Sequence, residues 1–280
     1  MTTKTNIRKP SFAGMFYPAT GAEIRYFLDE ITEEEGGEKS GQASGHILGG
    51  VLPHAGMRFC ARQAVPFFDQ LSRSGQNPGT VVLVHPNHVG HGPPLSVDGH
   101  DKWETPMGQV PVDYEMSEEM GIPAAPHAQD QEHSAEVLLP YLQYFLPNNF
   151  QIVVVNMLYQ NAEIAGKLAN KVFEAAKKLQ KNVLFLASSD FSHFITPEKA
   201  KVLDDMVLDK IMDKDVTGVF EVIKNYNISV CGYGPVMALM EYSKLSDPNY
   251  EVHLLSRGHS GEVMPADKVV SYITFLFKKS

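Results

Sequence analysis

Side chains that bind metals or move protons follow three apolar runs of this chain, at the point where each run ends. They are His54 after the first run, His88 after the second, and Asp190 and His193 after the third. If the runs are strands of an open α/β sheet, ligands bind in the crevice outside the carboxyl ends of those strands. We therefore expect these four side chains to lie close together.

A further histidine stands in the segment His133-Ser134-Ala135-Glu136. We predict that this segment opens a helix that runs to Leu146 despite Pro140. Residues three apart on a helix are neighbours on one face, so this helix would present His133 and Glu136 together.

A thiol completes the set of candidate ligands. Cys231 stands before an apolar helix predicted over Val236–Tyr242. The amide dipoles at a helix start favour the thiolate form of such a cysteine. Imidazole and thiolate together suit zinc, iron or copper rather than magnesium or calcium.

Each of these residues also has a purely structural interpretation. A lone histidine is more often a hydrogen-bonded structural residue, Cys231 can be a small buried hydrophobe, and Asp190 can serve a cap or a turn. The glycines beside His54 and Cys231 can serve tight turns. The spacing matches neither HExxH nor CxxC. The residues alone therefore indicate a site only through their expected convergence.

The elements that must position these side chains alternate along the chain. Apolar runs rich in β-branched residues predict strands buried on both faces, as in parallel or mixed sheets. The predicted strands are Ile47–Leu52, Thr80–Val84, Gln151–Val155 and Asn182–Ala187, with a C-terminal strand over Val269–Phe277. Helical patterns lie at residues 24–31, after a capping box at Thr20–Glu23, and at residues 164–179 and 219–223.

This alternation predicts an α/β fold, a layered α/β/α sandwich around a mixed, largely parallel sheet. We expect one domain over residues 1–280. The polar, glycine-rich stretch at residues 33–45 predicts a mobile surface loop. A domain boundary at that stretch is the alternative, although the segment before it is short for a core of its own.

The composition excludes several classes of function. The chain has 280 residues, 43% of them hydrophobic and 20% charged, which suits a globular fold. A formal charge of −9 with no basic run argues against a nucleic-acid partner. No apolar stretch approaches the roughly 20 residues that span a bilayer. Two cysteines and an N-terminus unlike a signal peptide favour the cytoplasm.

Taken in order, the motifs resemble those of the Memo family, whose microbial members are called AmmeMemoRadiSam system protein B. The resemblance spans roughly residues 10 to 275. The matching segments are Ala13-Gly14-Met15-Phe16-Tyr17, Pro53-His54-Ala55-Gly56, Pro86-Asn87-His88, His133-Ser134-Ala135-Glu136, Ser188-Ser189-Asp190-Phe191-Ser192-His193 and Cys231-Gly232.

The resemblance implies a fold similar to class III extradiol dioxygenases, in which two histidines and a carboxylate hold Fe(II). It places His54 and His88 on the family's two histidine positions and Cys231 on its cysteine. It implies iron (Fe(II)) or copper as the metal, with zinc as an alternative. His133, Asp190 and His193 fall on motifs that line the same pocket and are our candidates for catalytic residues.

Two hypotheses about function follow from the resemblance. In the first, the chain is a metal-dependent oxidoreductase in which His133 or His193 moves protons and Asp190 orients a ligand histidine. In the second, it is a non-catalytic protein whose cleft binds a peptide, a small molecule or a metal, and the name of the microbial members implies a radical-SAM partner protein. A third hypothesis, which we rank lower, is metal-free nucleophilic catalysis by Cys231.

Overall fold

A mixed sheet forms the centre of the protein in the computed structural model, which describes residues 5–35, 45–147 and 149–280. Within these residues the sheet has eight strands. Its four central strands run parallel, in the order β2 (Ile47–Leu52), β8 (Val183–Ser188), β3 (Thr80–Pro86) and β7 (Gln151–Met157). Antiparallel strands flank them, namely β11 (Val269–Lys278), β10 (Glu251–His259) and β9 (His193–Ile195) on one side and β4 (Leu95–Val97) on the other.

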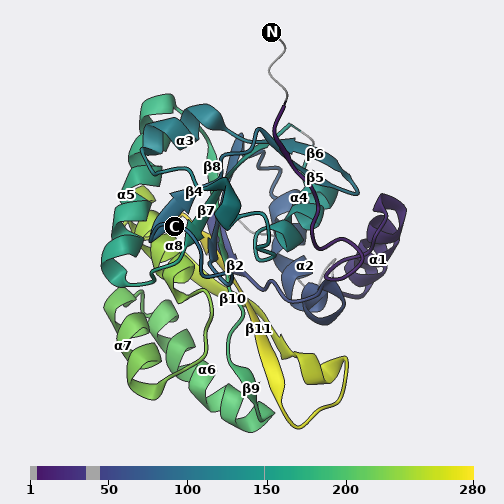
Figure 1. Cartoon of the computed structure of the whole chain (residues 1–280). Coiled ribbons are helices and arrows are strands. Elements are labelled where there is room, and N and C mark those ends of the chain that lie inside the picture. The colour runs from purple at the N-terminus through teal and green to yellow at the C-terminus, as the bar shows by residue number, and fades with distance from the viewer. Residues whose placement is uncertain (1–4, 36–44, 148) are drawn as a thin grey trace.

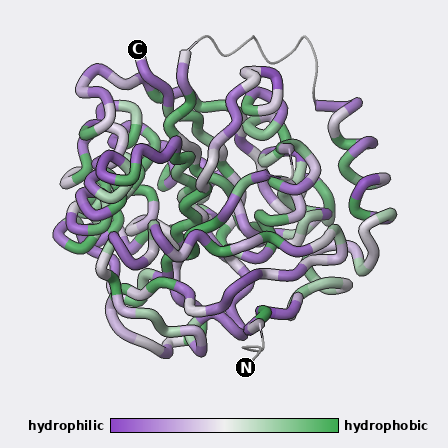
Figure 2. The backbone as a smooth tube through the Cα atoms, turned by 90° about the horizontal axis from the view of Figure 1, so that it is seen from above, coloured by the Kyte–Doolittle hydropathy of each residue, from purple (hydrophilic) through white to green (hydrophobic). Residues whose placement is uncertain are grey.

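Helices cover both faces of this sheet (Figure 1). Successive residues of a strand point to opposite faces, and β3 shows this, with Val82 and Val84 in one core cluster and Val81 and Leu83 in the other. The first face carries α3 (Tyr114–Met120), α5 (Ala162–Leu179), α6 (Pro197–Met212), α7 (Val216–Tyr226) and α8 (Tyr233–Ser246). The second carries α1 (Gly21–Glu35), α2 (Met57–Arg73) and α4 (Leu139–Phe145). In Figure 2 the hydrophobic residues, drawn in green, gather toward the inside of these layers.

A small second sheet lies beside the second core cluster. Its strands are β1 (Ile7–Arg8), β5 (Lys102–Thr105) and β6 (Gly108–Pro111), with β1 parallel and β6 antiparallel to β5. β5 contributes Trp103, which is fully buried. Short 3-10 turns at Pro126–Ala128, Glu136–Leu138 and Ser260–Glu262 complete the described elements.

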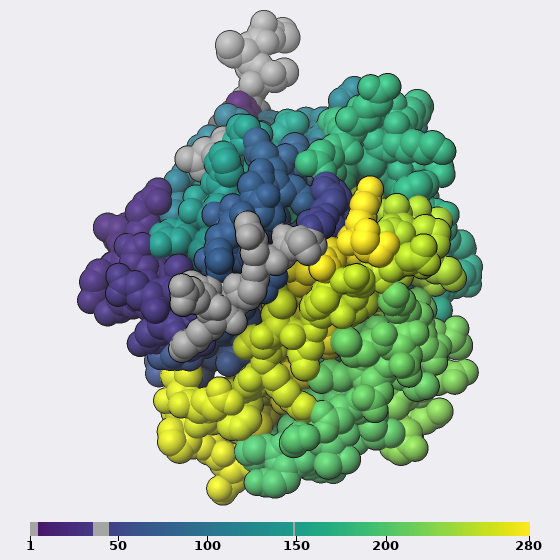
Figure 3. Space-filling view, turned by 180° about the vertical axis from the view of Figure 1, so that it is seen from behind, coloured from purple at the N-terminus to yellow at the C-terminus, as the bar shows by residue number. Residues whose placement is uncertain are grey.

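The predicted α/β sandwich is confirmed, and so are its principal elements. The four predicted parallel strands and the C-terminal strand all form, and the helix at 164–179 is α5. The capping box also forms, since the Glu23 amide donates to the Thr20 hydroxyl and the Glu23 carboxylate accepts from the Thr20 amide. Seen from behind, β10 and β11 cross the molecule as a yellow band between the N-terminal part and helices α6 to α8 (Figure 3).

The prediction that a helix begins at His133 is wrong about its first residue. The regular helix begins at Leu139, and Pro140 lies in its first turn, where a missing amide hydrogen has no cost. Residues before it form a 3-10 turn in which the Glu136 side chain points to Arg8 and Tyr17 instead of sharing a face with His133. His133 is thereby free to face the histidines described below.

The remaining predictions on the elements differ in outcome. Of the stretch predicted as a loop, Glu33–Glu35 belong to α1, while residues 36–44 lie outside the described residues. The single domain stays a prediction. Helices α2 and α6 were not predicted from the sequence, and α2 contains Pro66. None of the helices among the described residues combines the length and the apolar character needed to cross a bilayer.

Candidate metal centre

Three histidines converge at the carboxyl ends of the central strands. His54 follows β2, His88 follows β3, and His133 stands before α4. One nitrogen from each ring lies within 4.8 Å of the other two. The ring centroids are 5.2 Å apart for His54 and His88, and 4.8 Å apart for His88 and His133. The three imidazoles therefore surround a space of the size that one cation would fill.

The His54 ring is held in one tautomer by Ser188, the last residue of β8. Its Nδ1 lies 2.8 Å from the Ser188 Oγ, and that hydroxyl donates its hydrogen to the carbonyl of Ser134 at 2.6 Å. The Ser188 oxygen can then only accept, so Nδ1 carries the ring hydrogen and Nε2 keeps its lone pair. Burial, with the charges of His133 and His88, lowers the pKa of His54 well below its usual range. His54 is therefore a neutral imidazole, and the lone pair on its Nε2 can bind a metal ion.

The His88 ring is held by a buried carboxylate, Glu132. Its Nδ1 donates to the Glu132 Oε1 at 2.9 Å, and the His88 amide donates to Oε2 at 2.6 Å. The Glu132 side chain is fully buried, and Ser134 also donates to it, from its hydroxyl at 2.8 Å. Burial alone would raise the pKa of Glu132, but the hydrogen bond from His88 and the charges of His85 and His88 hold it well below its usual range. This carboxylate–histidine pair leaves the His88 Nε2 free.

His133 completes the cluster from a half-buried position. Its Nδ1 lies 3.4 Å from the Glu132 Oε1, and its ring packs against Phe16 with 4.6 Å between centroids. Phe12 contacts the same ring at 5.6 Å. Burial lowers the pKa of His133 to about 4, although Glu132 opposes this. His133 is therefore also neutral near pH 7.

Cys231 lies at the edge of the cluster, beside His54. Its Sγ is 3.2 Å from the His54 Nε2 and accepts from the Asp190 amide at 3.2 Å. Since Nε2 of His54 is an acceptor, the thiol donates to it. Burial and the Asp190 carboxylate raise the pKa of the Cys231 thiol well above its usual range. The prediction that the helix start favours the thiolate is wrong, because desolvation and the neighbouring Asp190 carboxylate outweigh the amide dipoles and raise the pKa of the thiol.

Asp190 and His193 lie near the cluster but do not contact a ligand ring. The Asp190 Oδ1 accepts from the backbone amide of His54 at 2.8 Å. Burial raises the pKa of Asp190 to about 6, with the His54 amide and the charge of His193 opposing. The His193 Nδ1 donates to the Ser229 carbonyl at 2.7 Å, which leaves its Nε2 free. Asp190 thus fixes the backbone of His54, whereas the ring itself is oriented by Ser188.

Sequence reasoning missed the residues that orient the ligand rings. Glu132 and Ser188 were not singled out, and neither was Ser134, which connects them through its carbonyl and its hydroxyl. One signal was available, because Glu132 directly precedes His133 and a carboxylate beside a histidine is a common partner of a metal ligand. Ser188 ends an apolar strand and has no comparable signal.

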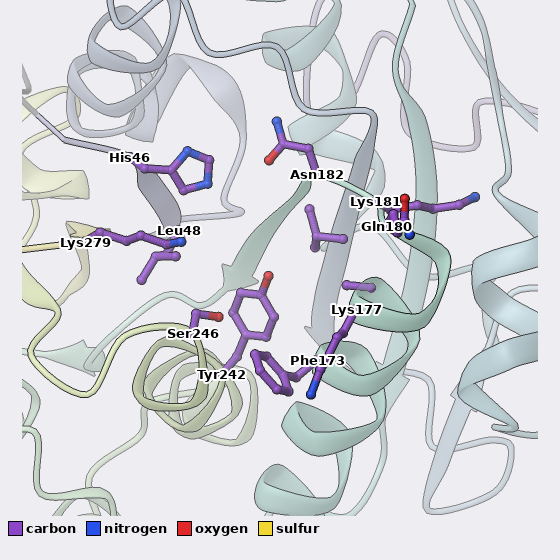
Figure 4. A pocket seen from close by; sticks show the side chains of 12 residues that line it. His46, Leu48, Phe173, Lys177, Gln180, Lys181, Asn182, Tyr242, Ser246 and Lys279 are labelled. Carbon is purple, nitrogen blue, oxygen red and sulfur yellow. The ribbon is translucent and has the colours of Figure 1, made fainter.

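A cavity lies where β2 and β8 begin, at the end of the sheet away from the histidine cluster, and Figure 4 shows the side chains that line it. It has a volume of about 330 Å³ and is lined by residues at the start of β2 and β8, including Leu48 and Val183. Its lysines have local roles: Lys181 pairs with Asp113 at 2.7 Å, and Lys177 lies in the last turn of α5, where it offsets the exposed carbonyls. This cavity is separate from the histidine cluster.

Comparison with known proteins identifies the family of this chain. A family profile described as Memo-like protein matches residues 8–276. A MEMO1 family protein of Methanobrevibacter smithii is 35% identical over 97% of this chain and 100% of its own length. A MEMO1 family protein of Archaeoglobus fulgidus is 36% identical over 97% of this chain and 100% of its own length.

Among solved structures, the fold is similar to that of the uncharacterized protein JW3007 of Escherichia coli K12. The TM-score is 0.54 at 11% identity, covering 82% of this chain and 99% of that one. At this identity the likeness concerns the fold alone. The family match and the relatives, each over nearly the whole chain, show that this chain belongs to the Memo family.

Proposed function

We propose that this Memo-family protein binds one transition-metal ion, iron or copper, between His54, His88 and a third ligand from Cys231 or His133. The observation that carries the proposal is that His54 and His88 each donate from Nδ1 to a buried acceptor. Both rings therefore present an unprotonated Nε2 on the cluster side. A structural histidine has no need of this shared orientation, whereas a metal ligand does.

The donor set fits such a metal. Neutral imidazoles with an adjacent thiol suit iron, copper or zinc. The high pKa of the Cys231 thiol does not oppose this, since a coordinating metal deprotonates a thiol outright. The carboxylates of Glu132 and Asp190 lie behind the ligands and offset the charge of the cation. Zinc remains an alternative, because its ligand preferences overlap with those of copper.

As an enzyme, the protein would be a metal-dependent oxidoreductase, the metal supplying redox chemistry and a position for substrate. The chain's own part would be to hold and move protons. His193 is suited to this, because its Nδ1 is fixed by Ser229 and its Nε2 is free to exchange a proton. Asp190, with a pKa of about 6, can hold or release one next to His54.

Metal titration of variants tests the proposal. Protein purified without oxygen should bind about one equivalent of Fe(II) or Cu(I), and His54→Ala and His88→Ala should each lose this binding. His253→Ala is the matched control, because its ring pairs only with the half-exposed Glu251. Full binding in both cluster variants would contradict the proposal.

A non-catalytic binding protein is the second candidate, and the position of a further donor, Cys231, beside the three histidines favours it. If His54, His88, His133 and Cys231 all ligate a four-coordinate ion such as zinc or Cu(I), no position stays open for substrate. The protein would then hold a metal, or bind a peptide or small molecule in the cleft, with a radical-SAM protein as a conceivable partner. Pulsed electron paramagnetic resonance of the Cu(II)-loaded protein in D₂O separates the two candidates: a bound exchangeable water favours the enzyme, and its absence favours the closed site.

A further inference from the structure

The buried guanidinium of Arg8 binds the segment that carries His133 of the cluster and Glu132, the partner of His88. Arg8 is 2% exposed. Its Nε donates to the carbonyl of Gln129 at 2.9 Å, and its Nη2 donates to the carbonyl of Glu132 at 2.8 Å. Its Nη1 donates to the carboxylate of Glu136 at 2.5 Å. One side chain from the N-terminal segment therefore fixes the segment 129–136 at three points.

The side chain of Glu136 adds further hydrogen bonds between the N-terminal segment and the segment 129–136. Besides Arg8 it accepts from the amides of Ser11 at 3.1 Å and Phe12 at 2.8 Å, and from the Tyr17 hydroxyl at 2.6 Å. Its side chain is fully buried. Residues 8–17, which include the aromatic rings against His133, are thereby tied to the segment 129–136.

The fixed segment leads directly to the ligand rings. Arg8 bonds the backbone of Glu132, and the side chain of that residue holds the His88 ring. His133 is the next residue along the chain. Gln129, whose carbonyl accepts from Arg8, also accepts through its side-chain Oε1 from the Nε2 of His85 at 3.0 Å. A shift of this segment would move the Glu132 carboxylate and His133 together.

We propose that Arg8 is a positioning residue of the metal centre, which sets where Glu132 and His133 stand and thereby the metal affinity. This inference rests on the proposed function, since it supposes that the cluster takes a cation. Arginine suits the role because its planar fork reaches three acceptors at fixed angles, which a lysine ammonium cannot reproduce. The guanidinium also lies 4.0 Å above the ring of Trp103, the single tryptophan of the chain.

The test compares Arg8→Lys with wild type by Co(II) titration of the full chain. We expect Arg8→Lys to keep its fold by circular dichroism and to bind Co(II) about 10- to 100-fold more weakly. The visible spectrum at saturation should also shift, since the ligand geometry changes. Trp103 fluorescence reports the displaced side chain independently of metal. Arg62→Lys is the matched control, because Arg62 is 44% exposed and pairs with Glu34 at the surface.

A double-mutant cycle shows whether Arg8 acts through Glu132. Glu132→Gln and Arg8→Lys together should weaken binding by less than the product of the two single effects. If Arg8→Lys does not fold, Glu136→Gln replaces it in the test. Glutamine keeps the shape of the Glu136 side chain but removes the negative charge that pairs with Arg8. The Co(II) affinity of this variant should fall between that of wild type and that of Glu132→Gln.

Three results would overturn the proposal. The first is an Arg8→Lys variant whose Co(II) affinity and visible spectrum match those of wild type while its Trp103 fluorescence is altered. Arg8 would then have a purely structural role. An unchanged affinity in Glu136→Gln, where that variant is needed, would show the same. A wild-type chain that binds no Co(II), Fe(II) or Cu(I) would contradict the proposed function itself, and this role of Arg8 with it.

Discussion

At the residue scale, the candidate site depends on which nitrogen of each ring carries hydrogen. Ser188 fixes this for His54 and Glu132 fixes it for His88. Both acceptors are buried, so neither water nor a rotation of the side chain readily replaces them. The two histidines were predictable from their places after apolar strands. The acceptors were not, because which side chain meets a ring depends on packing between segments that lie far apart in sequence.

Replacement of Glu132 by glutamine should weaken metal binding by about 10- to 100-fold. The amide keeps the shape of the side chain but removes the charge that accepts from the His88 Nδ1. Competition with a chromophoric chelator measures the affinity. Glu104→Gln, which removes a partly exposed partner of Lys9, should leave the affinity unchanged. Equal affinities of the Glu132→Gln variant and wild type would show that His88 needs no carboxylate.

At the element scale, β2 is the strand on which the site depends most. It lies between β11 and β8 in the sheet and delivers His54 at its end. Gly49 and Gly50 stand in its middle, where neighbouring atoms leave no room for a Cβ. A Cβ on Gly49 would overlap the carbonyl oxygen of Phe185, and one on Gly50 would meet the ring of Phe67.

Gly49→Ala should therefore destabilise the protein by about 3 kcal/mol, the upper range for overpacking a core. The clashing atom is the backbone oxygen of Phe185, which cannot move away by a change of rotamer as a side chain can. Gly166→Ala in α5 is the matched control, since no atom lies within 4 Å of its Cβ, and it should be neutral or stabilising by up to about 1 kcal/mol. Urea denaturation measures both. Equal stability of the two variants would contradict this account of β2.

The buried carboxylate of Asp113 ties α3 to the sheet. It caps the helix by accepting from the Met116 amide at 3.1 Å and also accepts from Thr80 and from Lys181 at 2.7 Å. Burial alone would raise the pKa of Asp113, but the hydrogen bonds from Lys181 and Thr80 lower it below its usual value. The charged form is thus the one that stabilises the fold.

Asp113→Asn should cost about 2 kcal/mol at pH 7, the sum of a weakened cap and a broken partly buried pair. Because the folded pKa is depressed, this stabilisation is present above the unfolded pKa of about 3.9 and is lost as the pH falls through the folded pKa. The difference from wild type should therefore shrink below about pH 4. Denaturation at several pH values measures it, and a difference that grows on acidification would contradict the account. Asp215→Asn, at the exposed cap of α7, should show a smaller loss.

The elements also differ in how well the sequence predicts them. The central strands are continuous apolar runs and α5 has a clear stripe, so both could be predicted. The helix after His133 was placed too early because Ser134 and Glu136 suit a helix start, whereas both side chains instead serve buried contacts. α2 contains Pro66 in its interior, where a proline disfavours a helix, so the sequence gives a weak signal for this element.

At the scale of the whole molecule, the fold brings distant parts of the chain to one edge of the sheet. The cluster draws on residues 54, 88 and 133, with Cys231 at its rim, and Arg8 and Glu136 tie the N-terminal segment to it. A cation at this place would bind only the folded chain. Its binding energy therefore adds to the stability of the whole protein.

Metal should accordingly raise the melting temperature. At a free concentration about 100 times the Kd, linkage gives about 2.7 kcal/mol of added stability. For a chain of this size that corresponds to a rise of several degrees. Differential scanning calorimetry without oxygen measures it. His88→Ala should show no rise, and a rise as large as that of wild type would indicate binding elsewhere on the molecule.

The most direct test of the central claim is anomalous X-ray diffraction from crystals of the protein loaded without oxygen with Fe(II) or Cu(I). The account predicts one anomalous peak about 2.0–2.3 Å from the Nε2 atoms of both His54 and His88, with Cys231 or His133 as a further ligand. A peak that contacts neither ring, or no peak from protein saturated with metal, would contradict it.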